Sequence, residues 1–166
     1  MIIAFLVAGT FFATSTAYAK TTPAKKATKW ALTIAGNDSY TYGNVNTCPK
    51  CKPTVQKKYG CAGFVIAAYA HGANDKTVKK WCQDGLHRTT KSLYSAMKGN
   101  KNWKYMGRLS ASKLKQGDVI FWKGHVEIYA GKNKTVGARG HNTISPKNDI
   151  AVYKLQTGWS KVMRHK

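Results

Sequence analysis

Hydrophobic residues recur every three or four positions through the first part of the chain, as they do on one face of a helix. Phe64, Val65, Ala68 and Tyr69 follow this spacing directly after Cys61. The pattern predicts four helices, from residue 23 or 25 to 35, from 61 to about 71, and over roughly 75–83 and 88–98.

After residue 118 the pattern changes to short runs of β-branched and aromatic residues, which are typical of strands. Gly131-Lys132-Asn133-Lys134 has the composition of a hairpin turn. Strands are predicted over 119–122, 125–130, 135–138 and 150–153, while 39–60 is interpreted as an irregular loop. Helices first and strands last indicate an α+β domain, with N-terminal helices packed on a C-terminal antiparallel β-sheet.

The first 19 residues predict a cleaved secretory signal peptide, and therefore a secreted, extracellular protein. Met1 to Phe12 are apolar and uncharged, and Ala17-Tyr18-Ala19 matches the small-x-small pattern of a signal-peptidase site. The apolar run is shorter than the about 18 residues of a membrane span, so no transmembrane segment is predicted. Residues 20–29 are expected to form a flexible basic lead-in, and 30–166 a single domain that acts as a monomer.

The charge is strongly one-sided, with 28 Lys and Arg against 6 Asp and Glu and a net charge of +22. Such an excess favours attraction to a polyanion. The alternative is that the lysines only keep the protein soluble. For a secreted protein the expected partners are anionic wall polymers held by charge, without specific recognition of nucleic acid. A second domain does not fit into a chain of this length.

Cys61 is a candidate nucleophile because it stands at the predicted start of a helix. The helix dipole, with Lys57 and Lys58 nearby, lowers the pKa of a thiol in that position. His125 begins a predicted strand after Gly124 and is the candidate base. Trp122, close to this histidine in the chain, is expected to lie near the cleft.

Four segments carry a family pattern: Tyr40-Thr41-Tyr42-Gly43, Gly60-Cys61-Ala62-Gly63-Phe64-Val65, Leu114 to Phe121, and His125-Val126-Glu127-Ile128-Tyr129. In this order they resemble the NlpC/P60 family of papain-like cysteine peptidases, which cut peptidoglycan stem peptides. The resemblance implies that Cys61 is the nucleophile, His125 the general base, and Tyr40 part of the binding cleft. It also implies amide hydrolysis through an acyl-enzyme, at the bond from D-glutamate to the next diamino acid, without a cofactor or metal.

Two departures from the family pattern affect substrate recognition. The family's Asp before the nucleophile is Gly60 here, and the Ser after it is Ala62. Asp38 is the candidate replacement carboxylate for a ligand amine.

A third departure concerns the residue that orients the base, which the family carries about a dozen positions after the histidine. Gly137 stands there and has no side chain. The favoured replacement is His141, with Asn142 next, and a backbone carbonyl, a water molecule or no group at all as the other possibilities.

The remaining cysteines are Cys48 and Cys51, in C-x-x-C spacing, and Cys82. A disulfide from Cys48 or Cys51 to Cys82 fits an oxidising compartment, whereas a Cys₃His zinc site would need His87 or His71. A thioredoxin-like role is not expected, because the pair does not lie between a strand and a helix.

Two other functions compete with the endopeptidase. One is a CHAP-like amidase that cuts the sugar-to-peptide bond with the same cysteine and histidine. The other is a catalytically inactive cationic protein that binds the wall or another polyanion, which the small residues Gly60, Ala62 and Gly137 favour.

Overall fold

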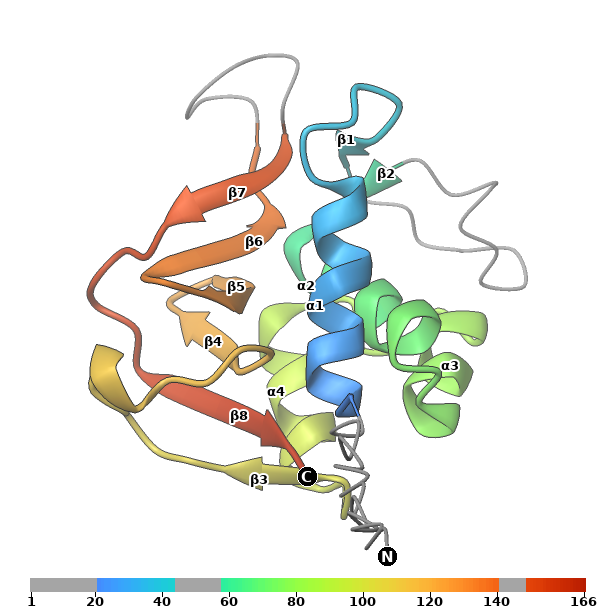
Figure 1. Ribbon diagram of the computed structural model, residues 1–166. Helices are drawn as coiled ribbons and strands as arrows, with labels where there is room; N and C mark the ends of the chain where they lie inside the picture. Colours follow the sequence, from blue (N-terminus) through green and yellow to red (C-terminus); the bar gives the residue numbers. More distant parts are fainter. Residues whose placement is uncertain (1–20, 44–57, 141–148) are drawn as a thin grey trace, which may run out of the picture.

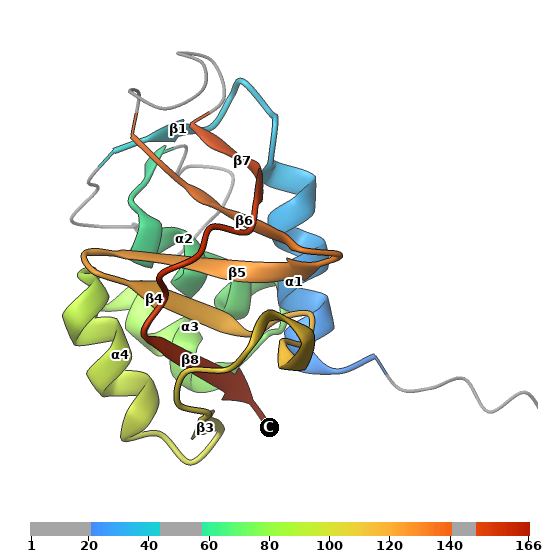
Figure 2. The same ribbon diagram turned by 90° about the vertical axis from the view of Figure 1, so that its left-hand side faces the viewer.

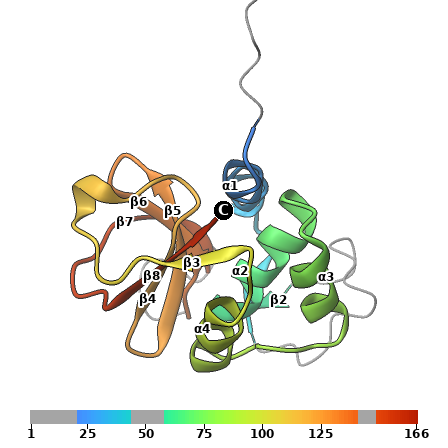
Figure 3. The ribbon, with the colours of Figure 1, turned by 90° about the horizontal axis from the view of Figure 1, so that it is seen from below.

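The computed structural model describes residues 21–43, 58–140 and 149–166. A six-stranded antiparallel sheet forms one layer and the α-helices pack on one of its faces (Figures 1 and 3). The strand order is β3 (Trp103–Tyr105), β8 (Lys161–His165), β4 (Val119–Trp122), β5 (His125–Gly131), β6 (Lys134–Ala138) and β7 (Ile150–Lys154). The helices are α1 (Pro23–Ile34), α2 (Cys61–Ala67), α3 (Lys76–Gln83) and α4 (Thr90–Lys98).

Shorter elements complete the described part of the chain. A π-helical turn, η2 (Ala68–Gly72), extends α2, and a 3₁₀ turn, η3 (Ala111–Lys113), precedes β4. β1 (Thr41–Tyr42) and β2 (Lys58–Tyr59) pair in parallel and lead into α2. The predicted α+β architecture is therefore confirmed, and so are the four predicted helices and four predicted strands, with shifts of one or two residues at their ends.

Helix α1 corrects the prediction of a flexible lead-in over residues 20–29. The helix begins at Pro23, where the Thr22 side chain accepts a hydrogen bond from the Lys25 N–H. Ala27 is fully buried, and a Cβ at Gly72 would lie 2.6 Å from the Cβ of Trp30. This close packing on η2 makes residues 23–29 part of the domain.

Helix α2 is the central helix, and every residue from Ala62 to Ala67 is buried. On one face of the sheet Val126 and Ile128 join the main core with α2, while on the other face Ile120 and Tyr129 belong to a second, smaller cluster. Because α2 is held on all sides, its first residue, Cys61, has a fixed position beside β5.

Two hairpins carry β5. A tight turn joins β4 to β5, with Trp122 opposite His125, and the sheet faces the viewer in Figure 2. At the other end Lys132 and Asn133 have φ of 52° and 54°, the conformation of a two-residue type I′ turn, at the hairpin that the sequence predicts. The register of this second hairpin decides what lies around His125.

Cys82 forms a disulfide, as predicted, and its partner lies outside the described residues. Its sulfur is therefore not a thiolate ligand for zinc. Within 21–43, 58–140 and 149–166, no group of three or more His, Cys, Asp or Glu side chains is placed to hold a metal ion. No helix in the same ranges has the length and apolar character that crossing a membrane requires.

Candidate active site

Cys61 and His125 lie together, as the sequence predicts. Cys61 is the first residue of α2 and carries a free thiol that is partly exposed. His125 is the first residue of β5, and its ring lies close enough to the sulfur to lower the pKa of the thiol. A nucleophile and a base in direct contact are the minimum that thiol catalysis needs.

Several groups stabilise the thiolate of Cys61. Burial raises the pKa of the thiol, but the hydrogen bond and positive charge of His125 outweigh burial, and the net effect is a lowered pKa. The Thr90 hydroxyl, 3.8 Å from Sγ, and the backbone N–H of Val126 lower it further. Thr90 is the first residue of α4, so three separate elements surround the sulfur.

Glu127 is the third member of the cluster. Its Oε1 lies 2.9 Å from Nε2 of His125, which leaves the other ring nitrogen for the sulfur. The carboxylate is completely buried and stands on the same strand as the base, two residues further on. Because side chains alternate along a strand, residues 125 and 127 share one face of β5.

Arg139, the residue directly after the neighbouring strand β6, holds this carboxylate. Its Nε donates to Oε1 of Glu127 at 2.6 Å and its terminal nitrogen to Oε2 at 3.0 Å, a two-point contact. The guanidinium carbon also lies 3.9 Å above the ring of Tyr153. Burial raises the pKa of Glu127, but the hydrogen bonds with His125 and Arg139 prevail and bring it down to about 2.

The same contacts raise the pKa of His125. Burial lowers the pKa of the imidazole, while its hydrogen bonds to Cys61 and Glu127 raise it to about 9. The lowered thiol pKa and the raised imidazole pKa both favour a thiolate beside an imidazolium over the neutral pair. That form is the reactive one in a cysteine hydrolase.

Gly137 provides the space that Glu127 occupies. Ile128 pairs with Val136, so in this antiparallel register residue 127 lies opposite residue 137. A Cβ on Gly137 would stand 2.6 Å from Cγ of Glu127. The two positions therefore share one volume, and only one of them can carry a large side chain.

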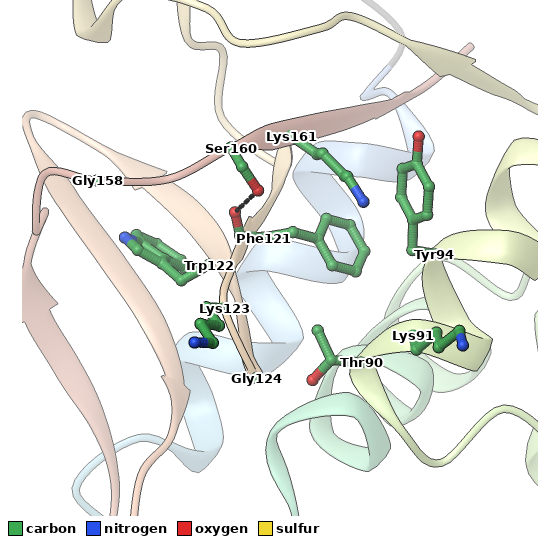
Figure 4. A pocket seen from close by; sticks show the side chains of 10 residues that line it. All are labelled: Thr90, Lys91, Tyr94, Phe121, Trp122, Lys123, Gly124, Gly158, Ser160 and Lys161. Carbon is green, nitrogen blue, oxygen red and sulfur yellow. Dashed lines mark hydrogen bonds between the residues drawn. The ribbon is translucent and has the colours of Figure 1, made fainter.

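Two hollows flank the pair. The first, called here the lysine hollow, has a volume of about 440 Å³ and is lined by Thr90, Tyr94, Phe121 and three lysines, Lys91, Lys123 and Lys161 (Figure 4). The second, the histidine hollow, has about 360 Å³ and includes Tyr42, His125 and Arg139. Trp122 lines both, and its role in substrate binding stays a prediction. Together they leave room for a ligand beside Thr90 and beside His125.

Comparison with known proteins agrees with this geometry. The sequence matches the NlpC/P60 family over residues 37–164. The chain belongs to the NlpC/P60 family. No curated protein matches the sequence.

Solved NlpC/P60 structures share the fold. The P60 domain of antigen MAP1204 from M. avium subspecies paratuberculosis is 18% identical with a TM-score of 0.52, over 86% of this chain and 93% of that one. NlpC2 from Trichomonas vaginalis is 14% identical with a TM-score of 0.55, over 87% of this chain and 46% of that one. The protein RipA, in a variant mutated at H432, is 19% identical with a TM-score of 0.54, over 86% of this chain and 62% of that one. The chain thus spans less than two thirds of NlpC2 and of RipA.

The other predicted site residues have different places in this NlpC/P60 domain. Tyr40 is half-buried and stacks on Tyr59, with ring centroids 6.2 Å apart, next to the start of α2. Asp38 is exposed in the turn between α1 and β1, and no described contact joins it to Cys61. The predicted orienting residues, His141 and Asn142, lie outside the described residues, so their role stays a prediction.

Four residues at the site were not predicted: Tyr42, Thr90, Glu127 and Arg139. Tyr42, rather than Tyr40, lines the histidine hollow, and burial together with the charge of Cys61 raises its pKa. A signal for Glu127 was present in the sequence. It is one of only six acidic residues and stands inside an apolar strand, two positions from the candidate base.

Proposed function

We propose that this protein is a cysteine hydrolase that cuts amide bonds in peptidoglycan stem peptides. The observation that carries the proposal is the His125 ring, which lies between the Cys61 thiol, whose pKa it lowers, and the Glu127 carboxylate, 2.9 Å from Nε2. Membership of the NlpC/P60 family and the two hollows beside the sulfur support it.

In the proposed reaction the thiolate of Cys61 attacks the carbonyl carbon of the scissile amide. The negative charge that develops on the carbonyl oxygen is stabilised by donors at the start of α2, including the backbone N–H of Cys61, which has no partner within the helix. His125 gives its proton to the departing amine, and the C–N bond breaks to leave a thioester. His125 then takes a proton from water, which attacks the thioester and restores the thiolate.

Glu127 acts on this cycle as a positioning residue. Its carboxylate keeps the imidazole ring oriented and stabilises the imidazolium form between the two proton transfers. Arg139 keeps Glu127 ionised, so the proton stays on His125 and does not pass to the carboxylate.

The proposed scissile bond is the one between D-glutamate and the diamino acid, as the family resemblance implies. Gly60 and Ala62 remove two side chains that relatives place near the substrate. The residues that recognise the stem peptide here are therefore proposed to come from the walls of the two hollows.

The charge distribution supports a proposed role outside the cell on an anionic wall. Four of the six acidic residues are buried, namely Asp75, Asp118, Glu127 and Asp149. Only Asp38 and Asp84 are exposed, so the accessible charge is almost entirely positive. The disulfide at Cys82 fits an oxidising compartment, in agreement with the signal peptide expected at residues 1–19.

The test is mass spectrometry of purified peptidoglycan digested by residues 20–166, run beside the Cys61→Ala variant. New fragments that depend on the thiol are expected, with termini inside the stem peptide. Free stem peptides with an N-terminal alanine would instead identify an amidase. Absence of fragments under reducing conditions, with several wall chemistries, would refute hydrolysis and leave the cationic binding protein.

A further inference from the structure

The lysine hollow shares part of its wall with the surroundings of Cys61 and His125. Thr90, whose hydroxyl lies 3.8 Å from the Cys61 sulfur, forms part of its wall. Gly124, the residue before His125, forms another part. A group bound in this hollow therefore lies within about one residue of a scissile bond held at the sulfur.

The floor of the hollow is apolar and aromatic. Phe121 is 2% exposed, and its ring meets that of Tyr94 edge to face with centroids 5.6 Å apart. In Figure 4 the two rings form the inner wall, and the Lys161 side chain extends between them. Such a surface favours an aliphatic chain.

The charge of the hollow has one sign. Lysines reach it from three elements: Lys91 from α4, Lys123 from the β4–β5 turn and Lys161 from β8, and no acidic residue is among the described residues that line it. The ammonium of Lys161 lies 4.2 Å above the Tyr94 ring, a contact that holds it against the aromatic wall of the hollow. No carboxylate in the described part of the chain pairs with this ammonium.

We propose that the lysine hollow is a subsite for a carboxylate of the substrate, carried on a short aliphatic chain next to the scissile amide. The chain lies on Phe121 and Tyr94, and Lys161 binds the carboxylate. Stem peptides that contain diaminopimelate carry such groups on both D-glutamate and the diamino acid. The inference rests on the proposed function, and it makes the lysine hollow the feature that selects free-acid stem peptides over amidated ones.

The test measures equilibrium binding to the Cys61→Ala variant, which does not turn over its ligand. The probes are the synthetic tetrapeptide L-Ala-γ-D-Glu-diaminopimelate-D-Ala and the same peptide with the carboxyl groups of the two central residues converted to amides. We expect the free acid to bind about tenfold more tightly, the size of one charge-assisted hydrogen bond at a partly exposed site.

Two further substitutions in the same background assign this preference to Lys161. Lys161→Met keeps the aliphatic contact with Tyr94 and is expected to abolish the preference for the free acid. Lys154→Met removes an equal charge from an exposed position on β7, outside the hollow, and is expected to preserve it. Equal binding of the two peptides, no binding of either, or the same loss in both lysine variants would overturn the proposal.

Cleavage of the same peptides by the intact protein separates this proposal from the proposed function. Cleavage without any preference for the free acid refutes the subsite and leaves the hydrolase. Selective binding without cleavage supports the subsite and refutes the hydrolase.

Discussion

Replacing Glu127 with glutamine removes the negative charge beside His125 while keeping the size of the side chain. The glutamine oxygen can still accept from Nε2 of His125, but the amide nitrogen then faces the terminal nitrogen of Arg139, and both are donors. The substitution therefore destabilises the imidazolium form of His125 and leaves the mostly buried guanidinium of Arg139 without its counter-charge.

The magnitude follows from the pKa of His125, which the site raises from 6.5 to about 9. One pKa unit corresponds to about 1.36 kcal/mol, so this difference corresponds to about 3 kcal/mol of stabilisation of the imidazolium. The His125 side chain is 27% exposed, and Cys61 supplies part of the effect, so we assign about 2 kcal/mol to Glu127 after solvent screening. The expected loss in kcat/KM is about 30-fold.

The assay is kcat/KM on a stem peptide, measured together with thermal unfolding, for Glu127→Gln and for Glu127→Gln/Arg139→Met. The single variant is expected to lose both activity and stability, because Arg139 is left with an unpaired charge. In the double variant methionine still packs on Tyr153, so stability returns while activity stays low. Recovery of activity together with stability would show that Glu127 only supports the fold, and would refute its role in orienting His125.

Three other predictions concern the same cluster. The pH profile of kcat/KM is expected to be bell-shaped, with an alkaline limb near pH 9 where His125 loses its proton, and Glu127→Gln should move that limb to lower pH. Thr90→Val removes one hydroxyl hydrogen bond to the sulfur, so we expect the thiol pKa to rise and kcat/KM to fall about fivefold. The pH dependence of alkylation measures the thiol pKa, and an unchanged value would contradict the prediction. Gly137→Asn alone should inactivate and destabilise the protein, because its Cβ meets Glu127. The double variant Glu127→Gly/Gly137→Asn should recover stability and part of the activity. A well-folded, active single variant would contradict the conclusion that the two side chains share one volume.

The helices and central strands were predictable because each buries a face whose hydrophobic spacing is visible in the sequence. β8 was not predictable in this way. Its sequence, Lys161-Val162-Met163-Arg164-His165, is mostly polar, yet Arg164 pairs with Asp118 and His165 with Asp75. These partners are 46 and 90 residues away, so no local pattern reveals that the strand is accommodated inside the sheet.

The positions of Cys61 and His125 were predictable for a different reason. Cys61 starts a helix and His125 starts a strand, and both positions follow from the local sequence. Thr90 and Arg139 reach the site only through the packing of α4 and the register of β6. Residues of this kind become visible only when the arrangement of the elements is known.

The third member of the site shows how a missing side chain can direct attention to the wrong place. Gly137 in the orienting position favours either a substitute from the following loop, which stays a prediction, or an inactive protein. The register shows instead that residues 127 and 137 share one volume, so a glycine at 137 is what allows a glutamate at 127. Because Arg139 stands two residues beyond that glycine on the same face, it pairs with the carboxylate that is buried there. Gly137 and Glu127 are therefore structurally coupled, since a side chain at position 137 would exclude the Glu127 carboxylate from its place beside His125.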